Sequence, residues 1–259
     1  GQTEVISSFN FEVEDLGWTV GDISDTADAG IWEIDVPVAT YFENNQAQPG
    51  VDHSSNGEMC YLTGSATSES VGYDDVDNGK TTLFSPVFDL SGNNEVLVSY
   101  WKWYTNDVGD NPNNDYWQVD VTNDGQTWYS LENTNESSPE WIKKQFLLSA
   151  SGISITSNMQ FRFIAEDATY QGDNGSGGSI IEAAIDDFTI EVFESGEDTV
   201  LGDINSDGSI DILDIVMLVN FVLNVNEPNP NQFSASDINN DGVINILDIV
   251  AVVGIIIGD

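Results

Sequence analysis

Basic residues are scarce in this sequence, which has 5 Lys and Arg against 45 Asp and Glu and a formal net charge of −40. Such a surface offers few cations to replace the counterions of nucleic acids or anionic lipid headgroups. We therefore exclude nucleic acid and acidic membrane surfaces as main partners. The same surplus of carboxylates favours the binding of multivalent cations.

Cysteine and histidine occur once each, as Cys60 and His53. A single cysteine excludes an intrachain disulfide and a cysteine-rich metal centre. Nucleophilic catalysis needs a serine or cysteine beside an oriented base, and no such signature surrounds either residue. Phosphate-binding loops and zinc motifs are also missing. We predict that the chain is not an enzyme and that Cys60 is a buried, small apolar residue.

Long hydrophobic segments are missing as well. The longest apolar run near the end, residues 249–257, is far shorter than the about 20 residues that a membrane-spanning helix needs. No charged-then-apolar leader begins the sequence. We expect no membrane insertion, and a chain that is either cytosolic or already processed for secretion.

The composition changes near residue 196, since every Lys, Arg, Trp and Tyr precedes it. We predict a first domain over residues 1–195, a linker over 196–200 and a second domain over 201–259. Short strands separated by turn residues indicate a mostly β first domain, a jelly-roll β-sandwich. The expected strands are residues 81–88, 95–104, 116–122, 126–131, 159–165 and 183–193, with a hairpin turn at Asp124-Gly125.

The second domain contains an internal repeat, because the pattern of residues 203–216 recurs over 237–250. Calcium prefers six to eight oxygen ligands, supplied in such loops from positions 1, 3, 5, 7, 9 and 12 with glycine at position 6. Gly208 and Gly242 occupy position 6. We predict two calcium loops, with ligands from Asp203, Asn205, Asp207, Ser209 (carbonyl), Asp211 and Asp214, and from Asp237, Asn239, Asp241, Val243 (carbonyl), Asn245 and Asp248.

Each loop leads into an apolar helix, expected over residues 213–225 and 247–257, and no entering helix fits before either loop. Two loop–helix units with Asp at position 12 resemble a type I dockerin domain over residues 201–259. The resemblance implies a small helical pair that folds with calcium and docks into a protein partner. That family often has a Ser-Thr pair at positions 10 and 11, whereas this chain has Ile212-Leu213 and Ile246-Leu247. We predict that these side chains form an apolar docking surface, for the β-domain or for another protein.

The first domain carries a second resemblance. Residues 9–12 (Phe-Asn-Phe-Glu), 52–57 (Asp-His-Ser-Ser-Asn-Gly) and 184–188 (Ala-Ile-Asp-Asp-Phe) are similar to a MAM-type jelly roll of the kind found in immune-inhibitor-A metallopeptidases. Such domains are non-catalytic adhesion or accessory modules, often with a structural calcium. The resemblance implies that Glu12, Asp52 and one of Asp186 or Asp187 are ligands. The alternative is that these are solvated carboxylates.

Other features of the first domain leave alternatives open. The oxygen-rich segments 74–78 and 106–115 fit solvated turns, which we expect, but also an ion site or a ligand-binding rim. Residues 100–104 (Tyr-Trp-Lys-Trp-Tyr) alternate along a strand. We expect core packing from these rings, although exposed rings would stack on sugars.

Two main functions fit these features. The first is an extracellular, calcium-binding interaction or adhesion protein that binds a protein partner. The second is a surface filament subunit that binds copies of itself head to tail, which is a contact that does not close. A third is a carbohydrate-binding accessory module of a secreted hydrolase. Millimolar calcium outside cells keeps weak calcium loops filled, so we expect an extracellular or cell-surface location in a bacterial source.

Four short sequences fit glycosylation signals. Thr26 and Thr199 lie in segments that resemble O-glycosylation sites of secreted bacterial proteins. Asn135 and Asn174 fit the N-glycosylation pattern. Patterns this short also arise by chance.

Overall fold

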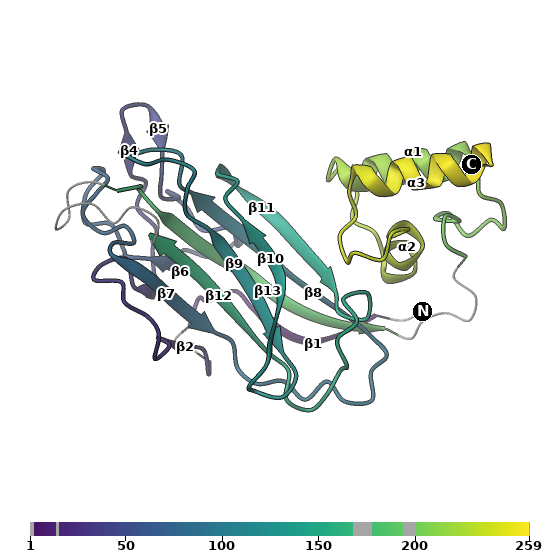
Figure 1. Cartoon of the computed structure of the whole chain (residues 1–259), viewed down its shortest axis with the longest axis horizontal. Helices are drawn as coiled ribbons and strands as arrows, with labels where there is room; N and C mark the ends of the chain where they lie inside the picture. Colours follow the sequence, from purple (N-terminus) through teal and green to yellow (C-terminus); the bar gives the residue numbers. More distant parts are fainter. Residues whose placement is uncertain (1–2, 14–15, 168–177, 194–199, 259) are drawn as a thin grey trace.

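The computed structural model describes residues 3–13, 16–167, 178–193 and 200–258, which form a β-sandwich followed by three short helices (Figure 1). The helices are α1 (Ile212–Val222), α2 (Pro230–Ser236) and α3 (Ile246–Ile257). The strands are β1 (Thr3–Phe9), β2 (Thr19–Val20), β3 (Trp32–Asp35), β4 (Tyr41–Phe42), β5 (Asn45–Gln46), β6 (Cys60–Thr63), β7 (Gly79–Phe84), β8 (Glu95–Thr105), β9 (Trp117–Thr122), β10 (Trp128–Thr134), β11 (Ser138–Leu147), β12 (Gln160–Asp167) and β13 (Glu182–Phe193).

Two antiparallel sheets make the sandwich. One has the order β11-β8-β13-β6-β3, with β1 also paired to β13, and the other has the order β10-β9-β12-β7-β2. From β7 to β13 the chain crosses repeatedly between the sheets, as in a jelly roll. The predicted β-sandwich is confirmed, and β9 and β10 form the expected hairpin at Asp124-Gly125.

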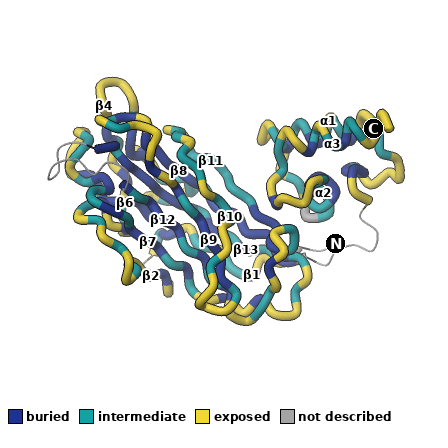
Figure 2. Tube along the Cα trace, in the orientation of Figure 1, coloured by how far each residue is buried: buried dark blue, intermediate teal, exposed yellow. Residues whose placement is uncertain are grey.

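Many aromatic side chains lie in the core between the sheets, whose strands include long buried stretches (Figure 2). Phe188 on β13 lies at the centre, with its ring centroid 5.2 Å from that of Trp18 and 5.6 Å from that of Phe161. Tyr100 and Tyr104 are each 1% exposed. The expected core packing of the aromatic strand is therefore confirmed for both tyrosines.

A buried carboxylate joins the two sheets at their β10–β11 side. Glu132 on β10 accepts hydrogen bonds from the Tyr100 hydroxyl at 2.8 Å and the Trp117 indole at 3.0 Å. Lys102 and Lys144 each place Nζ 2.8 Å from Glu132 Oε1. Burial opposes ionisation, but the two ammonium groups hold the pKa of Glu132 below its ordinary value. Two of the chain's few cations are thus bound to one acid.

In the helical part, each of the two long helices begins with a capping box. Asp211 and Asn245 are the N-caps of α1 and α3, and Asp214 and Asp248 bond back to the cap backbone. Leu218 of α1 and Val252 of α3 are fully buried in the small core between the helices. No helix among the described residues is long and apolar enough to cross a membrane.

The prediction that no helix enters either loop is wrong for the second loop. Helix α2 ends at Ser236, directly before Asp237. Asn229 caps it, bonding the Gln232 amide, while the Gln232 side chain bonds back to the Asn229 amide. Pro230 at the first helical position suits a helix start because its missing N–H has no partner there anyway.

The two parts of the chain touch through α2 and the second loop. Phe233 of α2 is 1% exposed and packs with Leu97 and Leu147 of the sandwich. Lys143 on β11 forms an ion pair with Glu227, with 2.8 Å between Nζ and Oε2. A cleft of about 290 Å³ lies beside this contact. The outer faces of α1 and α3 are not covered by the sandwich (Figure 1).

Replacement of Glu132 by alanine tests the buried network. Glu132→Ala leaves the Lys102 ammonium, which is 4% exposed, without its partner. Removing one partner of a buried pair costs about 3–5 kcal/mol, so we expect a loss of that size in denaturant unfolding of the sandwich. Glu140→Ala on exposed β11 is the control and should change stability little. Equal stabilities of the two variants would contradict the assignment.

A pH titration tests a second buried acid. Glu182 is 1% exposed, and burial, followed by the charge of Asp75, raises its pKa well above the ordinary value. A folded-state pKa above the unfolded one makes stability fall as pH rises from about 4.3 upward. Glu182→Gln keeps an acceptor for the Gln48 amide and removes this titration. We expect the variant to have a higher melting temperature than wild type at neutral pH and the same melting temperature at pH about 4. A difference in melting temperature that does not change with pH would contradict this.

Candidate calcium sites and docking surface

In the first predicted calcium loop, backbone amides donate hydrogen bonds to carboxylates of the same loop. Asp203 accepts hydrogen bonds from the amides of Asp207 at 3.1 Å and Gly208 at 2.9 Å. The Asn205 amide oxygen also accepts from Asp207, at 2.8 Å. Asp214, from the first turn of α1, reaches back to the Ile204 amide at 2.8 Å. These bonds bring positions 1, 3 and 12 of the loop together.

The second loop repeats this geometry. Asp237 accepts from the amides of Asp241 at 3.0 Å and Gly242 at 2.9 Å, and Asn239 accepts from Asp241 at 3.0 Å. Asp248 reaches back to the Ile238 amide at 2.9 Å. The remaining predicted ligands lie in the same loops, at Asp207, Ser209, Asp211, Asp241, Val243 and Asn245.

Both loops bury carboxylates where no basic side chain exists. Asp203, Asp214, Asp237 and Asp248 are each at most 6% exposed, and residues 201–259 contain no Lys or Arg. Burial raises the pKa of Asp237 and of Asp248. Buried charges are normally paired or bound to metal ions. The donor set, all hard oxygen, fits calcium.

The sandwich brings Glu12 and Asp52 together beside Gly57. A Cβ atom at Gly57 would collide with Glu12 Oε1 and Asp52 Oδ2. Asp52 Oδ2 is buried and has no hydrogen-bond partner. Burial, followed by the charge of Glu12, raises the pKa of Asp52. The Glu12 carboxylate also accepts from the amides of Glu58 and Met59.

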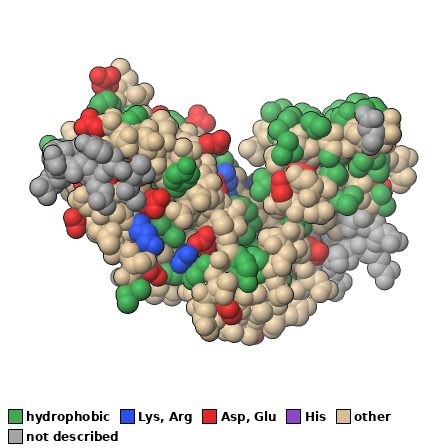
Figure 3. Space-filling view, viewed as in Figure 1, with side chains coloured by type: hydrophobic (Ala, Val, Ile, Leu, Met, Phe, Trp, Pro, Cys, Tyr) green, Lys and Arg blue, Asp and Glu red, His purple; other side chains and the backbone are tan. Residues whose placement is uncertain are grey.

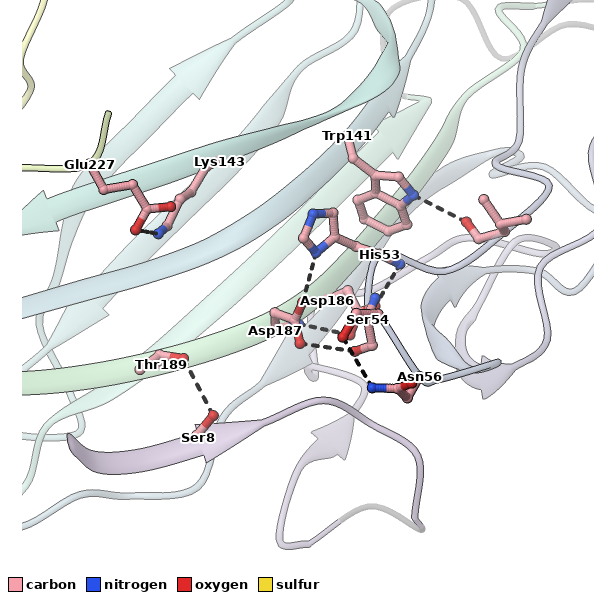
Figure 4. A network of polar contacts seen from close by, with 12 residues as sticks. Ser8, His53, Ser54, Asn56, Trp141, Lys143, Asp186, Asp187, Thr189 and Glu227 are labelled. Carbon is pink, nitrogen blue, oxygen red and sulfur yellow. Dashed lines mark hydrogen bonds and ion pairs between the residues drawn. The ribbon is translucent and has the colours of Figure 1, made fainter. Parts of the chain in front are cut away.

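Asp186 and Asp187 hold the loop that carries Asp52 (Figure 4). Asp186 Oδ2 accepts from the amides of His53 at 2.8 Å and Ser54 at 3.1 Å, and burial raises its pKa to about 7. Asp187 instead contacts the side chains of His53, at 2.7 Å, and Ser54, at 2.9 Å.

Burial raises the pKa of the Cys60 thiol, and the charges of Asp186, Asp52 and Glu12 add to this effect in that order. Asp186 and Asp187 both remain candidates for the third ligand, since Asp186 acts on Cys60 while the charge of Asp187 acts on Asp52. Cys60 itself is fully buried, as predicted. Among the described residues, however, no three His, Cys, Asp or Glu side chains already form a metal-binding group.

The oxygen-rich loops are only partly solvated. Asp107 and Asp110 are exposed, but Asp75 and Asp115 are at most 2% exposed. The expectation of solvated turns is therefore wrong for Asp75 and Asp115, because both residues are buried.

The outer aromatic side chains of β8 have partners within the chain. Trp103 donates to the Ala47 carbonyl at 2.6 Å and is buried. Trp101 stacks on His53, with 3.7 Å between the ring centroids. One face of this ring is therefore covered.

The four glycosylation candidates divide evenly between described and other positions. Thr26 is exposed, and its hydroxyl lies 3.4 Å from the Asn78 carbonyl. Asn135 is half-buried and donates to the Asn113 carbonyl at 2.8 Å. Thr199 and Asn174 lie outside the described residues.

The four predicted docking residues are exposed on α1 and α3 and are equivalent in the two repeats. Ile212 is 63% exposed and Ile246 60%, while Leu213 is 57% exposed and Leu247 59%. Apolar side chains gather over both helices in Figure 3. We name the exposed apolar residues that are equivalent in the two repeats the apolar face; it consists of Ile212, Leu213, Val216, Ile246, Leu247 and Val250.

Comparison with known families identifies the helical part. The family model "Dockerin type I domain" matches residues 201–256. This match supports calcium binding by the two loops and docking to a protein partner. No curated protein matches the chain.

Several solved structures are similar to the β-sandwich. The K1 cleaved adhesin domain of Lys-gingipain from Porphyromonas gingivalis is 15% identical, with a TM-score of 0.44, over 76% of this chain and 100% of that one. The CBM22-1–GH10 modules of xylanase 10B from Clostridium thermocellum, complexed with xylohexaose, are 14% identical, with a TM-score of 0.39, over 83% of this chain and 36% of that one. TmCBM61 in complex with β-1,4-galactotriose is 12% identical, with a TM-score of 0.38, over 68% and 88%.

Calcium removal tests the two loops. We expect chelation of the full chain to reduce its helical circular dichroism, since the buried Asp203 and Asp237 would repel neighbouring acids without an ion. Asp203→Ala combined with Asp237→Ala should reproduce this loss in the presence of calcium. Ser209→Ala is the matched control, because position 7 contributes its carbonyl, and should keep the calcium-dependent signal. A helical signal that ignores chelation would contradict the assignment.

Proposed function

We propose that this chain is an extracellular, non-catalytic accessory module, stabilised by calcium, that docks to a protein partner through the apolar face. The observation that carries the proposal is the equal exposure of equivalent apolar residues in the two repeats. A helix that faces water normally carries polar residues there. A surface of this kind marks an interaction site.

Calcium supports the docking surface by fixing the start of each helix. Asp214 and Asp248 belong to the loops and also to the first turns of α1 and α3. An ion bound by these carboxylates would hold each helix against its own loop. The apolar face begins at the same turns, with Ile212 and Ile246.

A third calcium in the sandwich is part of the proposal. Glu12, Asp52 and one of Asp186 or Asp187 would bind it, with the unpartnered Asp52 Oδ2 as the supporting observation. Such an ion would tie the segment after β1 to β13 and to the loop before β6. The resemblance to MAM-type domains implies the same clamp and remains a prediction.

The chemistry favours a location outside the cell. Millimolar calcium there would keep loops of modest affinity filled. Two alternatives keep the same apolar face but change its partner or role: head-to-tail assembly of copies of this chain into a filament, and a module that also binds glycan.

Substitution of the two leucines tests the docking surface. The double variant Leu213→Lys with Leu247→Lys places a charge in each half of the apolar face. We expect it to weaken binding of an immobilised type I cohesin domain at least about 100-fold, which is about 2.7 kcal/mol. Val87→Lys, at an equally exposed site on the sandwich, is the control and should bind like wild type.

Light scattering in millimolar calcium separates the possible partners. Association that grows with protein concentration and vanishes in the double variant would make a second copy the partner. Cohesin binding by a monomer would make the chain an accessory module. If neither binding nor association differed between the double variant and Val87→Lys, the apolar face would not be the docking surface.

A further inference from the structure

At the end of the sandwich that lies away from the helices, β12 ends beside the start of β7 (Figure 1), and two carboxylates are buried in this region. Asp167, the last residue of β12, is fully buried, and neither of its carboxylate oxygens accepts a hydrogen bond of ordinary geometry. The backbone amides of Asn78 and Ser179 lie close enough to oppose the rise in its pKa but do not cancel it. Asp75 is 2% exposed, and its Oδ1 likewise accepts no hydrogen bond of ordinary geometry. A buried, ionised carboxylate without compensation is strongly disfavoured. Both side chains therefore need a proton or a cation.

The two carboxylates are close enough to influence each other, together with Asp77. Burial raises the pKa of Asp75 and of Asp167 to about 7, and the charge of Asp77 contributes to both effects. The charge of Asp167 also acts on Asp75. The segment from Asp75 to Gly79 contacts two other parts of the chain. Gly79 pairs with Asp167 at the end of β12, and the amide of Val76 donates to the Ile181 carbonyl at 3.0 Å.

A cleft beside these residues gives an ion room and access. Asp75 and Asp77 line a cleft of about 250 Å³, with further walls from residues 109–110 and 178–180. Those two walls are joined, since the amide of Asp110 donates to the Gly178 carbonyl at 2.8 Å. Asp110 itself is exposed, so the cleft reaches solvent.

Basic side chains do not neutralise this site. In the described part of the chain, the ion pairs of Lys102 and Lys144 go to Glu132, that of Lys143 to Glu227, and that of Arg162 to Asp120. None of the ion pairs within the described ranges reaches Asp75, Asp77 or Asp167.

We propose that Asp75 and Asp77, which line this cleft, bind a divalent cation of the calcium type together with Asp167, which is buried behind it next to Ser179. Backbone carbonyls and water complete the shell, as calcium commonly allows. Among the described residues these three carboxylates do not yet form a ligating group, so binding requires their side chains to change rotamer. The ion ties β12 to the segment before β7. This site is distinct from the two dockerin loops and from the site at Glu12 and Asp52.

Calcium counting on the full chain tests the proposal. Equilibrium dialysis with radioactive calcium should show that Asp75→Asn combined with Asp167→Asn binds one calcium fewer per chain than wild type. Glu69→Gln, an exposed acid in the same part of the sandwich, is the control and should keep the wild-type number. Asp52→Asn reports separately on the other sandwich site, and Asp203→Ala with Asp237→Ala on the dockerin loops. Failure of those sites is thereby distinguishable from failure of this one.

Thermal unfolding of the sandwich provides a second readout. In chelator, the double asparagine variant should melt above wild type, because it lacks the buried repulsion. Calcium should then raise the melting temperature of wild type more than that of the variant. An unchanged calcium number together with an unchanged calcium-induced shift would overturn the proposal and leave Asp75 and Asp167 as protonated core residues.

A milder variant covers the case in which the double variant does not fold. Asp77 is only half-buried, so Asp77→Asn should fold and weaken calcium binding at this site at least tenfold. Wild-type affinity in Asp77→Asn would likewise contradict the proposal.

Discussion

The fold depends on how it neutralises carboxylates that it takes out of water. Acids outnumber basic residues 45 to 5, and the structure uses two of those cations on Glu132 alone. Asp52, Asp75, Asp167 and Asp186 are left without an ion pair. Burial raises the pKa of each of these four carboxyl groups, so each needs a proton or a cation. Calcium is the cation that we propose for this role, in place of the salt bridges and disulfides that a less acidic protein would use.

In each repeat of the helical part, one carboxylate belongs both to the loop and to the cap of the helix that follows. Asp214 bonds the amides of Ile204 and Asn205 in its loop and completes the capping box of α1 with Asp211. Asp248 does the same for α3. The loop and the helix cannot form independently, because each needs the same side chain in the same place. Folding of the loop is thus coupled to the presentation of the apolar face.

Local signals made part of this structure predictable from the sequence. The Asp124-Gly125 turn and the loop pattern around Gly208 and Gly242 depend on neighbours in the chain, and both appear where expected. Helix α2 was missed because its signal, a capping box from Asn229 to Gln232, is short and precedes a mostly polar segment. The position of Asp167 beside the segment that carries Asp75 could not be predicted, since it arises from the register of β12 against β7 over a long sequence separation. Composition even argued against it, because acids in such a chain are usually solvated.

The contact between the two parts of the chain breaks the symmetry of the repeats. In the described part of the chain, Phe233 of α2 and Ile244 of the second loop pack on Leu97 and Leu147 of the sandwich, whereas Phe221 and Val222 of α1 face the sandwich across the cleft. The ion pair from Lys143 to Glu227 holds the connection between the repeats at the same side. Both halves of the apolar face nevertheless stay exposed, because α2 inserts between the sandwich and the paired helices α1 and α3 (Figure 1). Helix α2, which leads into the second loop, is therefore the element that leaves the apolar face directed away from the β-domain, where we propose that a partner binds.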